Sequence, residues 1–230
     1  HAWSFRHWIV SRMPLEQTLQ ELEEMEQWCK THVTDHSGWN HRQHTINELA
    51  KRYEESGEDN NSSLKVILDE YKFVSGIMAP YPTHEALWCH RRFVVHGLLN
   101  HVSRGEINSG NMASVHEMLS RATSTLSSAK REPFEAATLI VAWDEILDAL
   151  RSNSTDGYLM LRALMCEIKT AWVCGNQFSR RYATWCHARL RIFCADDKQL
   201  ERTLITAEVR SSLQKHLINE DVLEDLWIRM

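Results

Sequence analysis

The chain has 230 residues, of which 43% are hydrophobic and 25% charged, and its formal net charge at pH 7 is −5. These proportions are typical of a globular protein with a sizeable core. The weakly acidic balance argues against a nucleic-acid-binding protein, which would need a basic face. The longest apolar run, residues 136–143, is far shorter than the roughly 20 residues that a membrane-spanning helix needs.

The cysteine, glycine and proline contents point to a helical protein from a reducing compartment. No two cysteines form a Cys-x-x-Cys pair, and scattered thiols in a chain of this size favour free side chains and a cytoplasmic location. Only 8 Gly and 4 Pro occur, and this scarcity favours helices because strands and turns depend on both residues. The six cysteines are Cys29, Cys89, Cys166, Cys174, Cys186 and Cys194.

The N-terminal third predicts two helices joined by a short turn. In residues 15–33, apolar side chains recur every three or four positions, which indicates an amphipathic helix with one buried stripe. The segment Asp35–Gly38 supplies a turn and an N-cap, and a second helix is expected from about Trp39 to Tyr53. The predicted buried stripe of the first helix is Leu15, Leu19, Leu22, Met25 and Cys29.

Further helices follow, and we expect no strand. Another helix is predicted from Leu64, and it ends at the two prolines of residues 79–83 because proline cannot continue the hydrogen-bond ladder. Thr83 is expected to cap the next helix. Residues 103–111 and 151–157 have loop composition. Helical spacing is expected in residues 112–129, 133–150, 158–178 and 180–193, and one or two helices in 196–230.

The pattern Trp-x-x-Arg occurs three times, with tryptophans at positions 3, 39 and 88, which are 36 and 49 residues apart. A feature that recurs at this interval indicates stacked helical hairpins, and so an all-α protein of the α-α superhelix type, a right-handed solenoid. On a helix, residues three apart share a face. We expect the Trp to fill the wedge between hairpins, and the Arg to bind carbonyls or carboxylates of the next unit or to lie over a ring. The alternative is a core Trp beside a solvated Arg.

Three segments, HAWSFRHWIV, SGWNHRQHTI and EALWCHRRFVV, resemble the α-subunit repeat of protein prenyltransferases, whose usual form is Asn-Tyr-x-x-Trp-x-x-Arg-Arg. The segment QFSRRYATW, which ends at Trp185, is similar to a degenerate final repeat. A tetratricopeptide array would repeat at about 34 residues with Gly and Tyr after the Trp, and both are absent. The resemblance is best over residues 1–100 and weaker over 170–190, and it predicts a repeat domain at 1–195. Residues 196–230 carry no repeat motif, and their apolar spacing predicts a C-terminal helical extension.

The resemblance implies a non-catalytic α subunit that is inactive without its β subunit. It would form a crescent that wraps a β subunit of the Rab geranylgeranyltransferase type, and the β subunit would hold the Zn²⁺ and the isoprenoid diphosphate, with no cofactor in this chain. A Zn²⁺-bound thiolate at the C-terminal Cys of a protein substrate would attack the geranylgeranyl group. The residues implied to be structural are Trp3, Arg6, Trp39, Arg42, Trp88, Arg91, Arg92 and Trp185.

The resemblance also indicates where active-site residues would lie. In the enzymatic α subunits, a Lys five residues before a motif Trp faces the diphosphate, and a Tyr three residues before it lies nearby. This chain has Thr34 and Thr83 at the first position and His36 and Glu85 at the second, so neither pair matches. The His two residues before the motif Trp, which lines the catalytic cleft, corresponds to His1.

Other chemistries have weaker support. The pairs His32/His36 and His41/His44 lack further ligands at zinc spacing, so we expect no metal site and polar histidines on helix surfaces. Adjacent Cys and His residues, as at positions 89–90 and 186–187, point in different directions on a helix and make poor nucleophile pairs. The segment WCHRR offers donors to a phosphate or an acidic partner. The alternative function is a non-enzymatic helical-repeat scaffold or adaptor.

Overall fold

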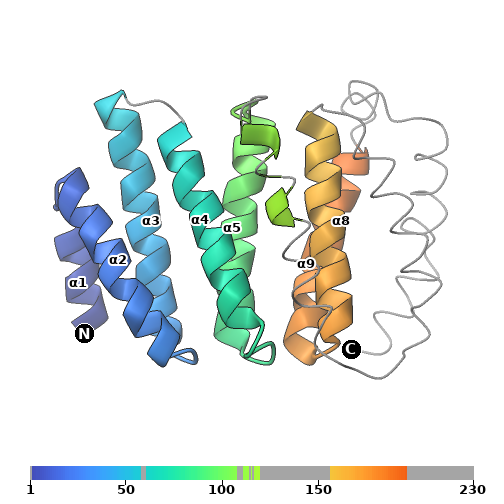
Figure 1. The fold of residues 1–230 in the computed structure, drawn as a ribbon, viewed down its shortest axis with the longest axis horizontal. Coiled ribbons are helices and arrows are strands. Elements are labelled where there is room, and N and C mark those ends of the chain that lie inside the picture. Colours follow the sequence, from blue (N-terminus) through green and yellow to red (C-terminus); the bar gives the residue numbers. More distant parts are fainter. Residues whose placement is uncertain are drawn as a thin grey trace. The chain divides into compact units, whose positions relative to one another are not determined.

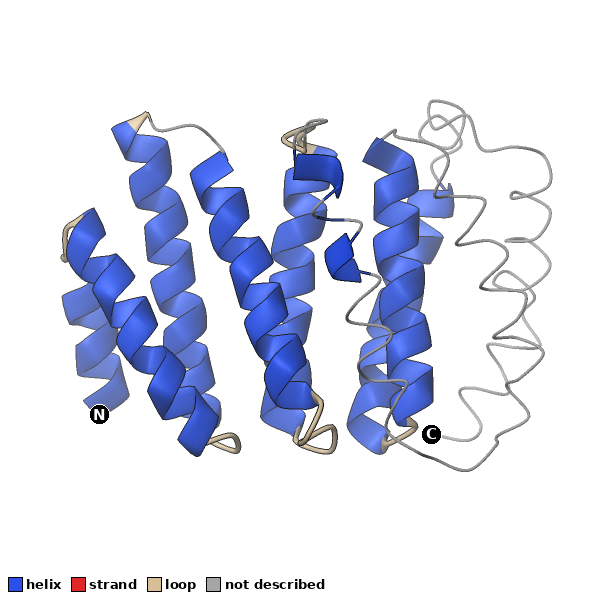
Figure 2. Ribbon diagram, in the orientation of Figure 1, coloured by secondary structure: helices blue, strands red, loops and turns tan. Residues whose placement is uncertain are grey.

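The computed structural model describes residues 2–57, 61–107, 111–113, 115, 117–119 and 156–195. All the elements in these ranges are helices joined by turns (Figures 1 and 2), which confirms the predicted all-α class. The chain divides into two compact units, His1–Glu106 and Ile107–Met230. The helix predicted in 112–129 is described, as helix, only at 112–113, 115 and 117–119. The helix predicted in 133–150 and the extension predicted in 196–230 lie outside the described residues, so the predicted domain division stays a prediction.

The first unit is built from two helical hairpins and one additional helix. Helices α2 (Leu15–Thr31) and α3 (His36–Ser56) form the first hairpin, and α4 (Asn61–Met78) and α5 (Glu85–Ser103) form the second. The two helices of each hairpin run antiparallel and meet at a short turn (Figure 1). Helix α1 (Ala2–Val10) packs on α3, which also contacts α4 and α5. Helix α3 is therefore the centre of this unit.

The second unit contains a third hairpin of the same kind, formed by α8 (Asp156–Cys174) and α9 (Gln177–Ala195). Gly175 turns the chain between them with a positive φ of 61°, a conformation that glycine adopts at low cost. The side-chain oxygen of Asn176 then accepts hydrogen bonds from the backbone N–H groups of Phe178 and Ser179, both at 3.0 Å. This N-cap starts α9.

The ends of the helices partly differ from the prediction. The cap at Asp35 is confirmed, since its carboxylate accepts from the Ser37 N–H at 3.0 Å, and α3 begins at His36 rather than near Trp39. The cap predicted at Thr83 is wrong. The N-cap residue of α5 is His84, and its side chain makes no capping hydrogen bond. The turn before α5 is held instead by the Trp88 indole, which donates to the Pro82 carbonyl.

The buried face of α2 is also rotated from the predicted leucine stripe. The predicted burial of Met25 and Cys29 is confirmed, but Leu15, Leu19 and Leu22 are only half-buried. The other buried residues of the helix are Thr18 and Glu21. In an amphipathic helix, charged residues ordinarily face solvent, but Glu21 is only 5% exposed. A carboxylate can occupy such a position only when charged or polar partners meet it there, and those partners come from other helices.

The cysteines and the apolar content of the helices can both be compared with the sequence predictions. The cysteines whose side chains the structure describes are thiols that form no disulfide: Cys29, Cys89, Cys166, Cys174 and Cys186. None of the described helices combines the length and the apolar character that crossing a membrane requires.

We expect that replacing Trp39 with alanine destabilises the protein by about 3–5 kcal/mol, because the indole is only 1% exposed and its loss leaves a cavity. The matched control is Trp8→Ala, because Trp8 is 54% exposed. Urea unfolding followed by circular dichroism measures both changes. Equal unfolding midpoints for the two variants would contradict the central position of Trp39.

Candidate functional site

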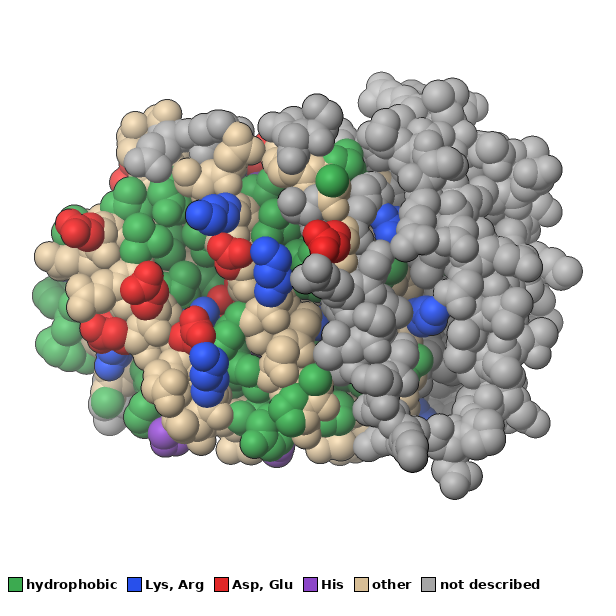
Figure 3. Space-filling model, in the orientation of Figure 1, with side chains coloured by type: hydrophobic (Ala, Val, Ile, Leu, Met, Phe, Trp, Pro, Cys, Tyr) green, Lys and Arg blue, Asp and Glu red, His purple; other side chains and the backbone are tan. Residues whose placement is uncertain are grey.

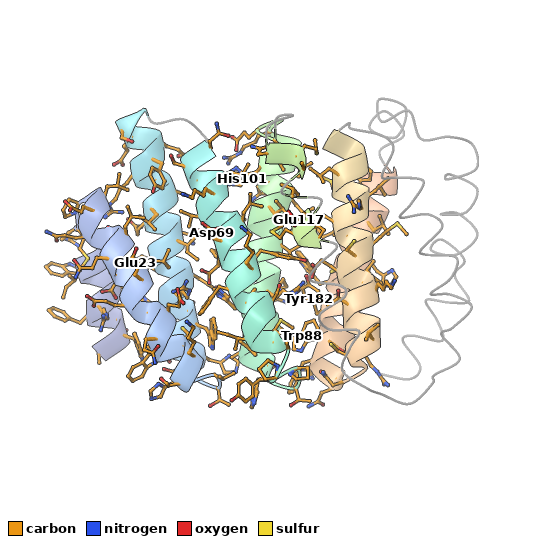
Figure 4. The ribbon with its side chains drawn as sticks, viewed as in Figure 1. Glu23, Asp69, Trp88, His101, Glu117 and Tyr182 are labelled. Carbon is orange, nitrogen blue, oxygen red and sulfur yellow. The ribbon has the colours of Figure 1, made fainter. Side chains whose placement is uncertain are left out.

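The motif tryptophans Trp39 and Trp88 occupy the same structural position in two successive hairpins. The indole N–H of Trp39 donates to the Val33 carbonyl at 2.9 Å, and that of Trp88 donates to the Pro82 carbonyl at 2.8 Å. Each acceptor lies six residues before its tryptophan, in the turn that leads into the helix. Both indoles are almost fully buried. Each Trp therefore closes its own hairpin at the turn; Figure 4 shows Trp88 near that end of α5 and His101 near the opposite end.

The other two motif tryptophans have different surroundings. Trp3 is half-buried; its ring contacts Trp28 edge-on at a centroid distance of 5.8 Å and lies 5.2 Å from the ring of His41. Trp185 is also half-buried, 5.8 Å from the ring of Tyr182, and the guanidinium of Arg189 lies 5.7 Å from its centroid.

The motif arginines Arg6 and Arg42 reach a carboxylate on the helix that follows their own. Arg6 contacts Glu21 through Nε at 2.6 Å and Nη2 at 3.0 Å. Arg42 contacts Glu70 in the same two-pronged manner, at 2.7 and 2.6 Å, and its guanidinium also lies 4.4 Å from the centre of the Phe73 ring. This bidentate geometry gives the strongest class of Arg–carboxylate contact.

Each of these carboxylates is also bound by a histidine from the helix after it. Nε2 of His41 lies 2.6 Å from Glu21, and Nε2 of His90 lies 2.5 Å from Glu70. In both cases the His follows the Glu by 20 residues and the motif Trp by two. We call Arg6–Glu21–His41 and Arg42–Glu70–His90 the ion triads. Each triad joins two successive Trp-bearing helices through the carboxylate of the helix between them.

The triads keep their carboxylates ionised although they are buried. Burial by itself would raise the pKa of Glu70, but the hydrogen bonds and positive charges of His90 and Arg42 outweigh it and lower the pKa to about 2. Burial likewise opposes ionisation of Glu21, and contacts from His41 and Arg6 lower its pKa to about 2. The triads are therefore charged contacts over most of the pH range in which a protein folds.

The two arginines that follow Trp88 have different environments. Arg91 is fully buried: Nη1 donates to Ser75 Oγ and Nη2 to the Tyr71 hydroxyl, both at 2.9 Å, and the guanidinium lies 4.7 Å from the Tyr71 ring centre. Arg92 is exposed and has no ion-pair partner within the described part of the chain. Only the first of the two arginines therefore holds the hairpin together.

The third hairpin keeps part of the register and changes the rest. Glu167 is buried, and His187 follows it by 20 residues. However, the hydroxyl of Tyr182 donates to Glu167 at 2.6 Å, and Ala188 stands where the motif would place an Arg. Burial lowers the pKa of His187 to about 4, so the ring is neutral at physiological pH.

Several residues near the expected active-site positions were missed or lie outside the described region. His1 is outside the described residues. Thr34 and Thr83 are exposed in the turns before their helices. Five residues before Trp185 is an exposed cation, Arg180. Three residues before Trp185 is Tyr182. Applying the same offsets to Trp185 as to Trp39 and Trp88 would have found both residues.

The histidine prediction needs correction. His32 and His36 are exposed as expected, but His41 and His90 are fully buried because each binds a buried carboxylate. Among the described residues, no three His, Cys, Asp or Glu side chains converge as a set of metal ligands. Burial raises the pKa of Cys29 to about 12, which makes this thiol a poor nucleophile.

Stacked helical hairpins with this repeated Trp, Arg and Glu register define a helical-repeat protein of the α-α superhelix class. Residues 18–49 match the family model described as protein prenyltransferase alpha subunit repeat. The matched range contains Glu21 and His41, which bind each other within the first hairpin, and Trp39 and Arg42, which contact the second hairpin. The chain thus carries a repeat of the protein prenyltransferase α-subunit family, which confirms the resemblance found in the sequence.

Curated relatives agree with this family. The chain is similar to protein prenyltransferase alpha subunit repeat-containing protein 1 of Danio rerio, at 32% identity over 41% of this chain and 28% of the relative. It is similar to the protein of the same name from Homo sapiens, at 29% identity over 46% and 33% respectively. The 1-B form of Xenopus laevis matches at 25% identity over 59% and 40%. The chain therefore spans less than half the length of these relatives. No solved structure shows a significant match.

Removing one member of an ion triad should lower the free energy of unfolding of the protein. We expect Arg42→Met to destabilise the protein by about 3–5 kcal/mol, because it leaves the charge of Glu70 buried without its bidentate partner. Arg92→Met is the matched control, since Arg92 is exposed and unpaired within the described residues. Urea unfolding of both variants measures the difference, and a small effect at Arg42 would show that the triad is dispensable.

The triads also predict a pH dependence. The folded pKa of Glu21 and Glu70 lies near 2, below the ordinary value of 4.5. Their contribution to the free energy of unfolding is therefore complete above pH 4.5 and is lost as the pH falls towards 2. Urea midpoints measured across this range should fall, and Glu70→Gln should flatten the decline relative to the wild type. A midpoint that stays constant down to pH 2 would argue against both assignments.

Proposed function

We propose that this chain is the α-type subunit of a heterodimeric protein prenyltransferase. In this role it would scaffold the β subunit and help to select the protein whose C-terminal Cys receives a geranylgeranyl group. The supporting observation is that residues 18–49 match the prenyltransferase repeat and contain two residues that contact the next hairpin. These are Trp39, whose ring lies 4.8 Å from that of His90, and Arg42, which binds Glu70. A rigid stack of hairpins suits a subunit that must hold an extended surface against a partner.

The chemistry is assigned to the partner. A Zn²⁺ ion bound there would supply the activation of the substrate thiolate, which would attack the isoprenoid with diphosphate as the leaving group. The described residues of this chain give no converging set of ligands for the metal. In the proposal these residues have a structural role. The buried indoles close each hairpin, and the ion triads fix the order and spacing of α1 to α5.

One residue of this chain is proposed to meet the leaving group. Arg180 stands five residues before Trp185, where the enzymatic α subunits have a diphosphate-facing Lys, and its side chain is exposed. A guanidinium pairs well with phosphate oxygens because its donors form a planar fork. The neighbouring Tyr182 is given no such role, because it is buried and donates to Glu167.

A second candidate function is a helical-repeat scaffold or adaptor with no part in prenylation. The observation that favours it is the lack of a cation at Thr34 and Thr83, the corresponding positions in the turns before α3 and α5 of the first unit. The two functions differ in whether a β subunit is bound.

The direct experiment is to coexpress the chain with a Rab geranylgeranyltransferase-type β subunit. We expect a stable one-to-one complex in size-exclusion chromatography, and transfer of geranylgeranyl from its diphosphate to a substrate protein ending in Cys. The Arg42→Met variant, which loosens the hairpin stack, should weaken the complex. A well-folded chain that binds no β subunit would favour the adaptor.

The role of Arg180 is tested in that complex. Arg180→Gln should raise the KM for geranylgeranyl diphosphate about 10-fold, which corresponds to the loss of one charge-assisted contact. Arg92→Gln, a change at another exposed arginine, should leave the KM unaltered. If both variants behave like the wild type while the complex still forms, the leaving group is bound without Arg180.

A further inference from the structure

Helix α1 is the least firmly held helix of the first unit. It has only nine residues, and Val10 is its only fully buried side chain. Isolated helices of this length are marginal in water, so α1 depends on its tertiary contacts. Besides the Arg6–Glu21 contact, Arg52 of α3 donates to the carbonyls of Val10 at 2.7 Å and Met13 at 2.6 Å. The remaining contact between α1 and α3 is built largely from histidines.

Three imidazoles meet at this contact: His7 of α1, and His41 and His44 of α3, which we call the imidazole cluster. The ring of His7 is stacked on that of His41, with centroids 5.0 Å apart and planes inclined by 5°. It also lies 4.7 Å from the ring of His44. Nε2 of His44 donates to the His7 carbonyl at 3.1 Å, so the cluster holds both the side chain and the backbone of α1.

The cluster has no place for an additional proton. Nε2 of His7 and Nδ1 of His41 are both buried, and no hydrogen-bond partner reaches either atom in the described part of the chain. A neutral imidazole can leave one nitrogen without a donor, but a protonated ring carries an N–H group on both nitrogens. Charging His7 would therefore bury a new donor without an acceptor, and a buried unpaired N–H is costly.

The charged groups around the cluster do not compensate a positive charge on His7. Arg6 lies on the same helix, and Arg52 of α3 binds the end of α1. The carboxylates beside the cluster are already engaged: Glu21 of α2 accepts from Arg6 and His41, and Glu48 of α3 accepts from Lys51 and Arg52. Glu48 also interacts electrostatically with His44, but no carboxylate among the described residues acts on His7. The exposed Glu24 of α2 acts on Arg6 rather than on the cluster. Burial and then the neighbouring His41 and His44 lower the pKa of His7.

We propose that the imidazole cluster is an acid-sensitive clasp that holds α1 against α3 when His7 is neutral and releases α1 in mild acid, while α2 to α5 stay folded. A His whose folded-state pKa lies below its ordinary value of 6.5 stabilises the docked state fully above that pH, and this contribution is lost as the pH falls below it. Release would uncover the faces of Trp3 and Trp28 that now contact each other. The inference stands on α1 and α3 alone and does not depend on the proposed function.

Hydrogen–deuterium exchange of the full chain, read by mass spectrometry, tests the clasp. After correction for the intrinsic pH dependence of exchange, amides of α1 should lose protection between about pH 7 and about pH 5, the range in which histidines titrate. Amides of α4 and α5 are the internal reference and should keep theirs, because the Glu70 carboxylate stays ionised in that range. If α1 is equally protected at both ends of the range, the clasp does not exist.

Two variants assign the effect to His7. His7→Phe keeps an aromatic ring for stacking but cannot be charged, so α1 should stay protected at about pH 5. His36→Gln removes an exposed histidine from the first turn of α3 and should still lose protection as the wild type does. The proposal is overturned if His7→Phe, docked at neutral pH, is released in acid like the wild type, or if His36→Gln abolishes the release.

Discussion

The structure depends on a carboxylate that is buried between two Trp-bearing helices and bound from both sides. Glu70 accepts Arg42 from the helix before it and His90 from the helix after it, and Glu21 does the same with Arg6 and His41. Removing a charge from water is costly, so such a residue tolerates few alternative arrangements. Apolar packing alone would allow one helix to slide along another, whereas a bidentate contact sets their register to within a hydrogen-bond length.

The Trp-x-x-Arg spacing separates two tasks on one face of a helix. The indole of Trp39 binds a carbonyl in its own hairpin, while the guanidinium one turn later reaches Glu70 in the next hairpin. The Trp39 ring also contacts Phe73 and His90 of the next hairpin, so the Arg42 ion pair adds to an aromatic contact between the two hairpins. Both tasks need groups on the same face, and a separation of three residues provides this. Acidic and basic side chains lie close together over the exposed sides of α2 and α4 (Figure 3), so charge also occurs where it is solvated.

The departures from this register lie at α1 and α9. In α1, Phe5 stands two residues after Trp3, where α3 and α5 have His41 and His90, and Phe5 is exposed. In α9, Ala188 replaces the motif Arg, and Tyr182 supplies the contact to the buried carboxylate. Two residues with a proposed role lie on these helices: Arg180 on α9, and His7, the member of the imidazole cluster that α1 supplies. The repeat pattern accounts for the residues that α3 and α5 share. The residues that differ in α1 and α9 have to be explained by the contacts that each of them makes.

The sequence by itself determined the helical class, the hairpins and the repeated tryptophans, because apolar spacing and the scarcity of Gly and Pro act locally along the chain. It did not show that Glu21, Glu70, His41 and His90 are buried. By local pattern, charged residues and histidines read as solvent-facing, and the burial of each here depends on partners up to 28 residues away. The same reason explains the misplaced leucine stripe of α2. Only the tertiary structure brings these charges together, since a contact between three helices leaves no periodic signal in any one of them.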